Sequence, residues 1–146
     1  MENNYLSIAN NDFEYYKHMK EYKYYNNTAS LCQQICEKLL KAVIEQVIPN
    51  ACNELRTHNL KKLFDLVKSE ISIEREYYLF LGTLTDYYYN ARYPGDDFVN
   101  VSEEDAMLCY AITEELHRVV NDWFRNNKPV RPDANVLIQA ALSGSK

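Results

Sequence analysis

The chain has 146 residues, 47% of them hydrophobic, and a net charge of −5. This length suits one domain, which we expect over residues 1–146, with its core at about 12–126 and a C-terminal tail at 127–146. The negative charge argues against a DNA-binding protein, because proteins that follow a phosphate backbone carry a broad basic surface. Only three glycines and four prolines occur and no strand pattern persists, so the predicted fold class is all-α.

The sequence offers no signal for a membrane, a metal or another cofactor. The chain begins Met-Glu-Asn-Asn, so we expect no signal peptide, and no apolar run approaches the length of a membrane span. The four cysteines form no CxxC pair and no histidine cluster accompanies them. We therefore expect a soluble, cytoplasmic protein with reduced cysteines.

Apolar residues recur at helical spacing in several segments. The predicted helices cover residues 11–25, 28–48, a segment that begins after residue 59, residues 74–92, and a last segment from Ser102 to about residue 126. Residues 1–10 are expected to be loose, and Asp133–Leu142 is expected to dock on the body or on a partner.

Two of these helices carry specific expectations. In the first, Tyr15, Met19 and Tyr22 fall on one face, and Asn11 or Asp12 is the expected cap. The second has the clearest apolar stripe, and Asn26, Asn27 and Thr28 before it can cap it. On its polar face Glu37 and Lys41 lie one turn apart and are expected to pair. The apolar stripe of this helix is Cys32, Ile35, Cys36, Leu39, Leu40, Val43 and Val47.

The stretch Tyr87–Gly95 ends the fourth predicted helix. Pro94 has no amide hydrogen and restricts the residue before it, so the helix should end at about Arg92–Tyr93. Arg92 has two interpretations. It can cap the helix and pair with one of the two aspartates that follow Gly95, or its planar set of donors can bind a phosphate between tyrosine faces.

The start of the third predicted helix supplies a second candidate residue. Thr57 fits the role of N-cap, and His58 fits a hydrogen bond that fixes the loop. Because a helix N-terminus attracts anions and histidine titrates near neutral pH, His58 is also a candidate ligand for phosphate. The other two histidines, His18 and His117, are expected at the surface or in packing.

Three segments, in this order, resemble the HEPN domain family. Gln34–Ala42, Gln-Ile-Cys-Glu-Lys-Leu-Leu-Lys-Ala, is similar to its Q-x-x-E-K-x-L-K-A helix. Thr57–Leu63 is similar to its T-H-x-L-x-x-L segment, and Ala91–Pro94 to its A-R-Y-P signature. An S-E-E-x-A helix start follows at Ser102, and the resemblance covers roughly residues 12–126.

The resemblance implies an up-and-down bundle of four or five helices, usually dimeric, that associates with nucleotides or RNA. Many relatives act beside a small nucleotidyltransferase, as its substrate-binding subunit or in a toxin–antitoxin pair. Some HEPN proteins are metal-independent ribonucleases with an R-x(4–6)-H motif. This chain lacks that motif, because no arginine is followed by histidine at that spacing.

The sequence and the resemblance together predict a binding module that holds a nucleotide, or a nucleotide-bearing partner, in a groove between helices. Arg92 would bind phosphate, His58 would assist, and Tyr93 would stack or orient. Lys38 and Lys41 would add local positive charge. Two alternatives remain: a structural homodimer or interaction protein with tyrosine-rich faces, and a ribonuclease in which His58 and Arg92 meet in space.

Overall fold

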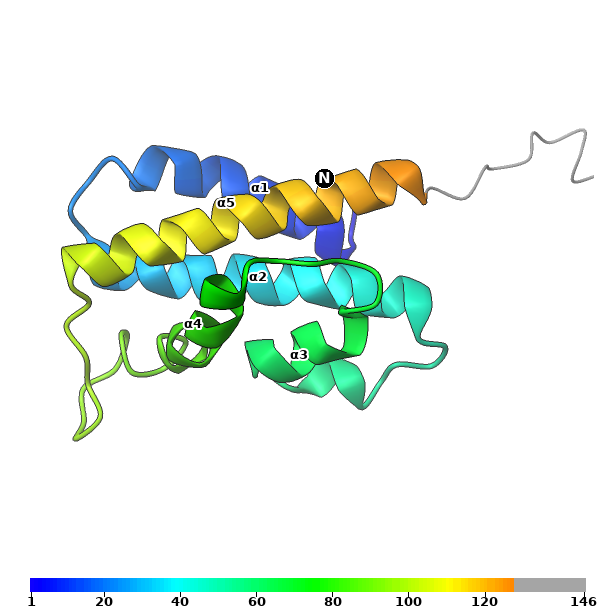
Figure 1. The fold of residues 1–146 in the computed structure, drawn as a ribbon. Coiled ribbons are helices and arrows are strands. Elements are labelled where there is room, and N and C mark those ends of the chain that lie inside the picture. The colour runs from blue at the N-terminus through cyan, green and yellow to red at the C-terminus, as the bar shows by residue number, and fades with distance from the viewer. Residues whose placement is uncertain (128–146) are drawn as a thin grey trace, which may run out of the picture.

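A computed structural model describes residues 1–127, and within them the secondary structure consists of helices joined by turns and loops, with no strand (Figure 1). This confirms the predicted all-α bundle. The predicted tail, including Asp133–Leu142, lies outside the described residues. The elements in chain order are α1 (Tyr5–Met19), α2 (Tyr25–Val47), the short 3-10 helix η1 (Glu54–Arg56), α3 (Leu60–Val67), α4 (Arg75–Asp86) and α5 (Glu103–Asn126).

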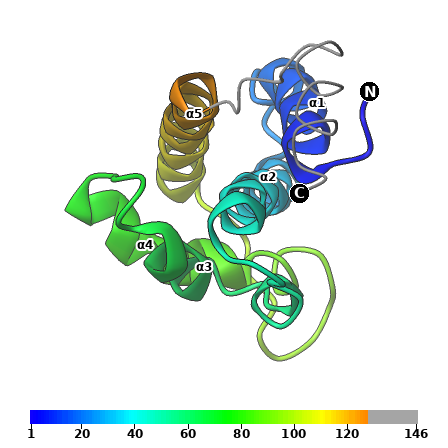
Figure 2. The same cartoon turned by 90° about the vertical axis from the view of Figure 1, so that its right-hand side faces the viewer.

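Helix α2 is the centre of the bundle. It packs between the pair α1 and α5 on one side and the shorter α3 and α4 on the other (Figures 1 and 2). Its predicted stripe is buried from Cys32 to Val43, and only Val47 at its end is partly exposed. At 1.5 Å per residue, its 23 residues span about 35 Å, so a site on α2 can draw side chains from all the other helices.

Helix α1 begins earlier than predicted. Asn4 is its N-cap, with the side-chain oxygen accepting a hydrogen bond from the amide of Ser7 at 2.8 Å. The helix ends at Met19, so the expectations of a loose segment at 1–10 and a helix at 11–25 were wrong.

The predicted face of α1 was also wrong. Tyr15 and Tyr22 are each 57% exposed, whereas Ala9, Phe13 and Tyr16 are buried. Tyrosines occupy neighbouring positions here, and either of two faces has helical spacing. Phe13 determines which face is buried, because its side chain has no polar atom that would favour contact with solvent.

The chain after α4 continues in tight turns rather than as a helix. Helix α4 ends at Asp86, earlier than the predicted end near Arg92. Backbone bonds still run from the amide of Asn90 to Asp86 (2.9 Å) and from that of Tyr93 to Tyr89 (3.1 Å). The backbone therefore keeps helix-like turns up to Tyr93. This is the expected limit, because Pro94 disfavours a helical conformation of the residue before it.

Asn26 fixes the loop that follows these turns. Its side-chain nitrogen donates to the carbonyl oxygens of Ala91 (3.1 Å) and Val99 (2.8 Å), and its oxygen accepts from the amide of Val101 (2.8 Å). Asn26 lies in the first turn of α2, so the expectation that residues 26–28 precede and cap that helix was wrong. The last helix begins as predicted, with the Ser102 hydroxyl accepting from the amide of Asp105.

No helix within residues 1–127 combines the length and the apolar character needed to cross a membrane.

The bonds of Asn26 predict a measurable loss of stability when they are removed. Asn26→Ala should lower the free energy of unfolding by about 1–3 kcal/mol, because partly buried backbone groups lose their partners. Urea unfolding measures this change. The matched control is Asn27→Ala, an exposed neighbour whose side chain makes no hydrogen bond within residues 1–127, and it should change stability by less than about 0.5 kcal/mol. Equal effects of the two substitutions would contradict the role given to Asn26.

Candidate functional site

Glu37 on α2 is a largely buried carboxylate with three hydrogen-bond donors. Only 13% of its side chain is exposed, and it accepts hydrogen bonds from Lys41 (2.9 Å), Gln33 (3.0 Å) and His58 (2.8 Å). Burial raises the pKa of Glu37, but the bonds from Lys41, Gln33 and His58 outweigh burial and lower the pKa below its ordinary value. Glu37 is therefore a carboxylate at neutral pH, and its predicted pairing with Lys41 is confirmed.

The residues before α3 bring His58 to Glu37. Asn59 is the N-cap of α3 and accepts from the amide of Lys62 at 3.1 Å, so the assignment of Thr57 as N-cap was wrong. The Thr57 hydroxyl instead accepts from the amide of Asn59. The first amide of α3, that of Leu60, donates to the hydroxyl of Thr85 on α4, which ties the two helices together at this end.

The imidazole of His58 lies between a carboxylate and an aromatic ring. It stacks on Tyr88 with the ring centroids 4.4 Å apart and the planes 14° from parallel. Its Nδ1 carries a proton, because the carboxylate of Glu37 can only accept. The side chain is 50% exposed, and Nε2 makes no hydrogen bond with any residue that the structure describes. This second nitrogen can therefore reach a ligand.

The guanidinium of Arg92 lies against two tyrosine rings. Its Cζ is 5.3 Å from the centroids of both Tyr88 and Tyr93, and one of its nitrogens donates to the Tyr93 hydroxyl at 3.2 Å. Among residues 1–127 it forms no ion pair, so the pairing with Asp96 or Asp97 was wrong. The positive charge is thus oriented by aromatic faces without being neutralised by a carboxylate.

Tyr88 brings the two candidate residues together, because both His58 and Arg92 contact its ring. These residues are far apart in sequence, and both are exposed rather than sealed in the core. We refer to Glu37, His58, Tyr88, Arg92 and Tyr93 as the Tyr88 cluster. It combines an imidazole, a guanidinium and aromatic faces at one surface.

The two lysines of the predicted site are both paired with carboxylates. Lys38 forms an ion pair with Asp12 of α1. Lys41 is buried, pairs with Glu37, and lies 6.0 Å from the ring centroid of Tyr5. Neither supplies an uncompensated positive charge, so the positive charge of the Tyr88 cluster rests on Arg92.

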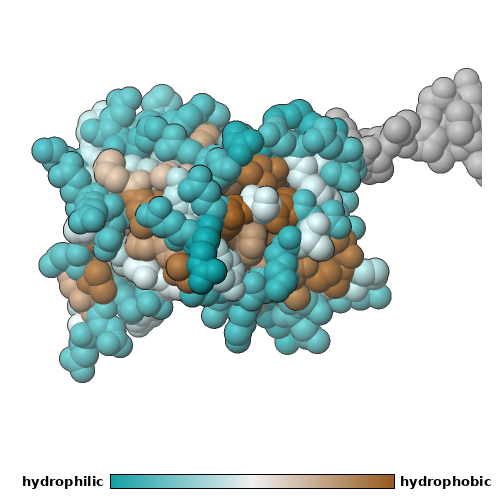
Figure 3. Space-filling model, viewed as in Figure 1, coloured by the Kyte–Doolittle hydropathy of each residue, from teal (hydrophilic) through white to brown (hydrophobic). Residues whose placement is uncertain are grey.

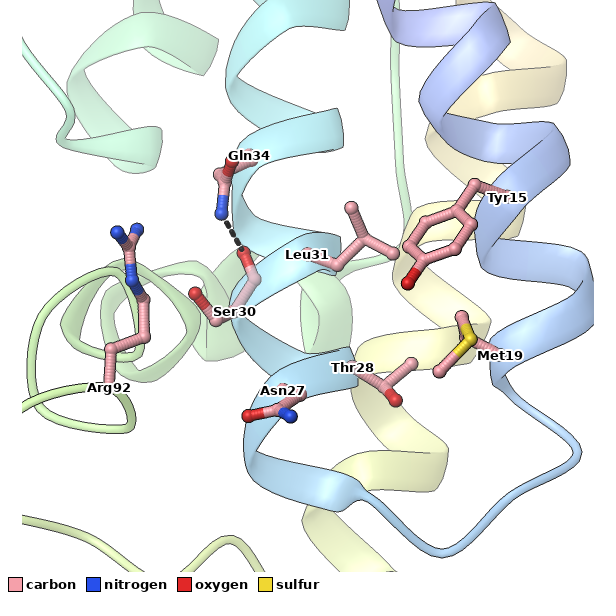
Figure 4. A pocket seen from close by; sticks show the side chains of 8 residues that line it. All are labelled: Tyr15, Met19, Asn27, Thr28, Ser30, Leu31, Gln34 and Arg92. Carbon is pink, nitrogen blue, oxygen red and sulfur yellow. Dashed lines mark hydrogen bonds between the residues drawn. The ribbon is translucent and has the colours of Figure 1, made fainter.

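A pocket of about 290 Å³ lies beside Arg92, close to the lower limit of the size of small-ligand sites (Figure 4). Helix α2 forms its floor, with Arg92 on one side and side chains of α1 on the other. Sequence reasoning missed this pocket, although polar residues on one face of α2 were a signal for it. The lining consists of Tyr15, Met19, Asn27, Thr28, Ser30, Leu31, Gln34 and Arg92.

These features define a helical module with a polar cluster and an adjoining pocket over its central helix. The family model of the HEPN domain matches residues 3–123. The chain therefore belongs to the HEPN domain family, as the three sequence motifs predicted, and this domain is a helical module often associated with nucleotides or RNA. Comparison with curated proteins gave no significant match, and comparison with solved structures gave none either.

The lowered pKa of Glu37 predicts a specific pH dependence of stability. A carboxylate with a lowered pKa stabilises the fold above its ordinary value of 4.5, and this contribution is lost as the pH falls through the lowered pKa. Glu37→Gln should therefore reduce the free energy of unfolding at pH 7 by about 1–3 kcal/mol, since buried Lys41 loses its carboxylate. The difference from the wild type should shrink below pH 4.5.

Denaturant unfolding of both proteins at several pH values between 3 and 7 measures the loss of stability at pH 7 and its decrease at low pH. Glu45→Gln, an exposed position on the same helix, is the matched control and should change stability by less than about 0.5 kcal/mol. A Glu37→Gln variant as stable as the wild type at pH 7 would show that the carboxylate is not the centre of this network.

Proposed function

We propose that the Tyr88 cluster binds the phosphate of a nucleotide, or of a nucleotide-bearing partner. The observation that carries this proposal is the state of Arg92: exposed, held against two tyrosine rings, and without an ion-pair partner within residues 1–127. A guanidinium has five donors in a planar arrangement that fits the oxygens of a phosphate. One donor is used by Tyr93, which leaves the others for a ligand.

The other residues of the cluster have supporting roles. The Nε2 atom of His58 has no hydrogen-bond partner within residues 1–127, so it is available to a ligand bound at Arg92. Tyr93 holds the guanidinium through its hydroxyl and its ring, so its role is to orient Arg92. The net charge of −5 favours a compact ligand over a long nucleic acid.

A partner protein has a separate surface available. Apolar side chains gather in a hollow beside α5 on the face shown in Figure 3. Leu79 of α4 and Met107 of α5 are 54% and 46% exposed, and Leu79 and Leu108 line a cavity of 460 Å³. This surface suits a second copy of the chain or a small nucleotidyltransferase subunit, as in a toxin–antitoxin pair.

Removal of Arg92 tests the proposed function. Wild-type protein should bind ATP, GTP or their monophosphates saturably in calorimetric titration. Arg92→Ala should weaken binding by about tenfold or more, because a hydrogen bond between charged groups contributes about 1.5–3 kcal/mol. The matched control is Arg118→Ala, whose guanidinium is already paired with Glu115 and Asp122, and it should bind as the wild type does. No saturable binding, or equal binding by wild type and Arg92→Ala, would leave the interaction-protein alternative.

A second candidate function is metal-independent cleavage of RNA. The observation in its favour is the imidazole of His58, which is held by Glu37 on one side and has its other nitrogen unpartnered among the described residues. Such an imidazole can take the proton from a 2′-hydroxyl as that oxygen attacks the adjacent phosphorus. The bond from phosphorus to the 5′-oxygen of the next nucleotide then breaks, and the imidazolium returns the proton to that leaving oxygen. Arg92, which contacts the same tyrosine ring, would stabilise the negative charge on the phosphate.

Incubation of pure protein with labelled RNA in EDTA tests this second function. Cleavage should fall by about 100-fold or more in His58→Ala, the usual size of a lost general base. His18→Ala, at an exposed position of α1, should cleave as the wild type does. A DNA strand of the same sequence should stay intact, since it has no 2′-hydroxyl. If the wild-type protein leaves the RNA intact, the proposed ribonuclease activity is wrong.

A further inference from the structure

The pocket beside Arg92 has an aromatic and apolar wall. Tyr15 and Met19 of α1 face Arg92 across helix α2, and Leu31 of α2 lies between them in Figure 4. Tyr15 is 57% exposed, because it lies on a face of α1 that does not pack into the core. An exposed tyrosine ring provides a flat face on which a nucleobase can stack, whatever the base.

The floor of the pocket carries side-chain amides suited to the edge of a base. The Asn27 side chain makes no hydrogen bond within residues 1–127 and is exposed. Gln34 donates from Nε2 to the carbonyl oxygen of Ser30 at 3.4 Å, which leaves its side-chain oxygen as an acceptor. Amide side chains offer both donors and acceptors, the combination that base edges pair with.

Ser30 supplies an independent sign of a ligand. It is 3% exposed, lines the pocket, and has a hydroxyl oxygen with no hydrogen-bond partner among the described residues. In Figure 4 this hydroxyl points from α2 toward Arg92. A buried polar group without a partner destabilises the fold, so a polar ligand in the pocket could relieve that cost.

Arg92 connects the pocket to the Tyr88 cluster. It lines the pocket and also contacts Tyr88, on which His58 stacks. Along α2, the distance from Asn27 beside the pocket to Glu37 beside His58 is about 15 Å at 1.5 Å per residue. A molecule in the pocket can therefore extend past Arg92 toward His58.

We propose that this pocket binds the base of a nucleoside phosphate, stacked on Tyr15, whose phosphate is bound by Arg92. Additional phosphates of a di- or triphosphate extend toward His58. The pocket has a volume of about 290 Å³ and is open on the side of Arg92, so a base inside it can keep its phosphate at the guanidinium. The inference rests on the proposed nucleotide binding and adds the position and orientation of the ligand.

The test compares a complete nucleotide with the same phosphate lacking a base. AMP and ribose 5-phosphate are titrated against wild type, Tyr15→Ala, Tyr15→Phe and Arg92→Ala. Tyr15→Ala should weaken AMP binding by about tenfold, the usual effect of losing one stacked base, and leave ribose 5-phosphate unchanged. Tyr15→Phe keeps the ring and should bind AMP as the wild type does, whereas Arg92→Ala should weaken both ligands.

Tyr22→Ala is the matched control, because Tyr22 is as exposed as Tyr15 but does not line the pocket. It should leave both affinities unchanged, and circular dichroism should show that every variant is folded. If Tyr15→Ala binds AMP like the wild type while Arg92→Ala loses it, the base pocket is wrong and phosphate binding stands. If AMP does not bind the wild-type protein, and neither do GMP, ATP and GTP, both proposals fail.

Discussion

The carboxylate of Glu37 is the constraint that shapes this side of the bundle. A charge with so little exposure must be hydrogen-bonded, or it would cost several kcal/mol. Two of its donors, Gln33 and Lys41, come from the turns of α2 before and after it, and the third is His58 in another segment. The loop before α3 is therefore held against α2 by an electrostatic requirement of the fold. His58 reaches the surface near Arg92 as a result.

Arg92 is positioned by a different kind of force. Asn26 holds the backbone next to it, and the rings of Tyr88 and Tyr93 hold its guanidinium. Neither the hydrogen bond from Asn26 nor the contacts with the tyrosine rings neutralises the positive charge of Arg92. Lys41 shows the contrast, since it is buried and neutralised by Glu37 and contributes to stability rather than to a ligand site.

The parts of the structure that could be predicted are those set by residues near one another in sequence. The apolar stripe of α2 and the cap at Ser102 follow from local spacing, as does the pairing of Glu37 with Lys41. The pairing of Lys38 with Asp12 could not be predicted, because it depends on how α1 packs against α2. The pocket was missed for the same reason, since its walls come from α1 and from the loop after α4. The face of α1 was uncertain because tyrosine suits both a core and a wet surface.

The bonds of Asn26 have a consequence for how relatives of this protein can diverge. They fasten the chain at Ala91 and again at Val99 and Val101, and the amide of Val99 also bonds to Asn90. The residues between these anchors form a closed segment whose tip, residues 94–97, is exposed. Substitutions, insertions or deletions at that tip would leave Arg92 where it is. Recognition of new ligands or partners could therefore evolve at the tip, independently of the cation behind it.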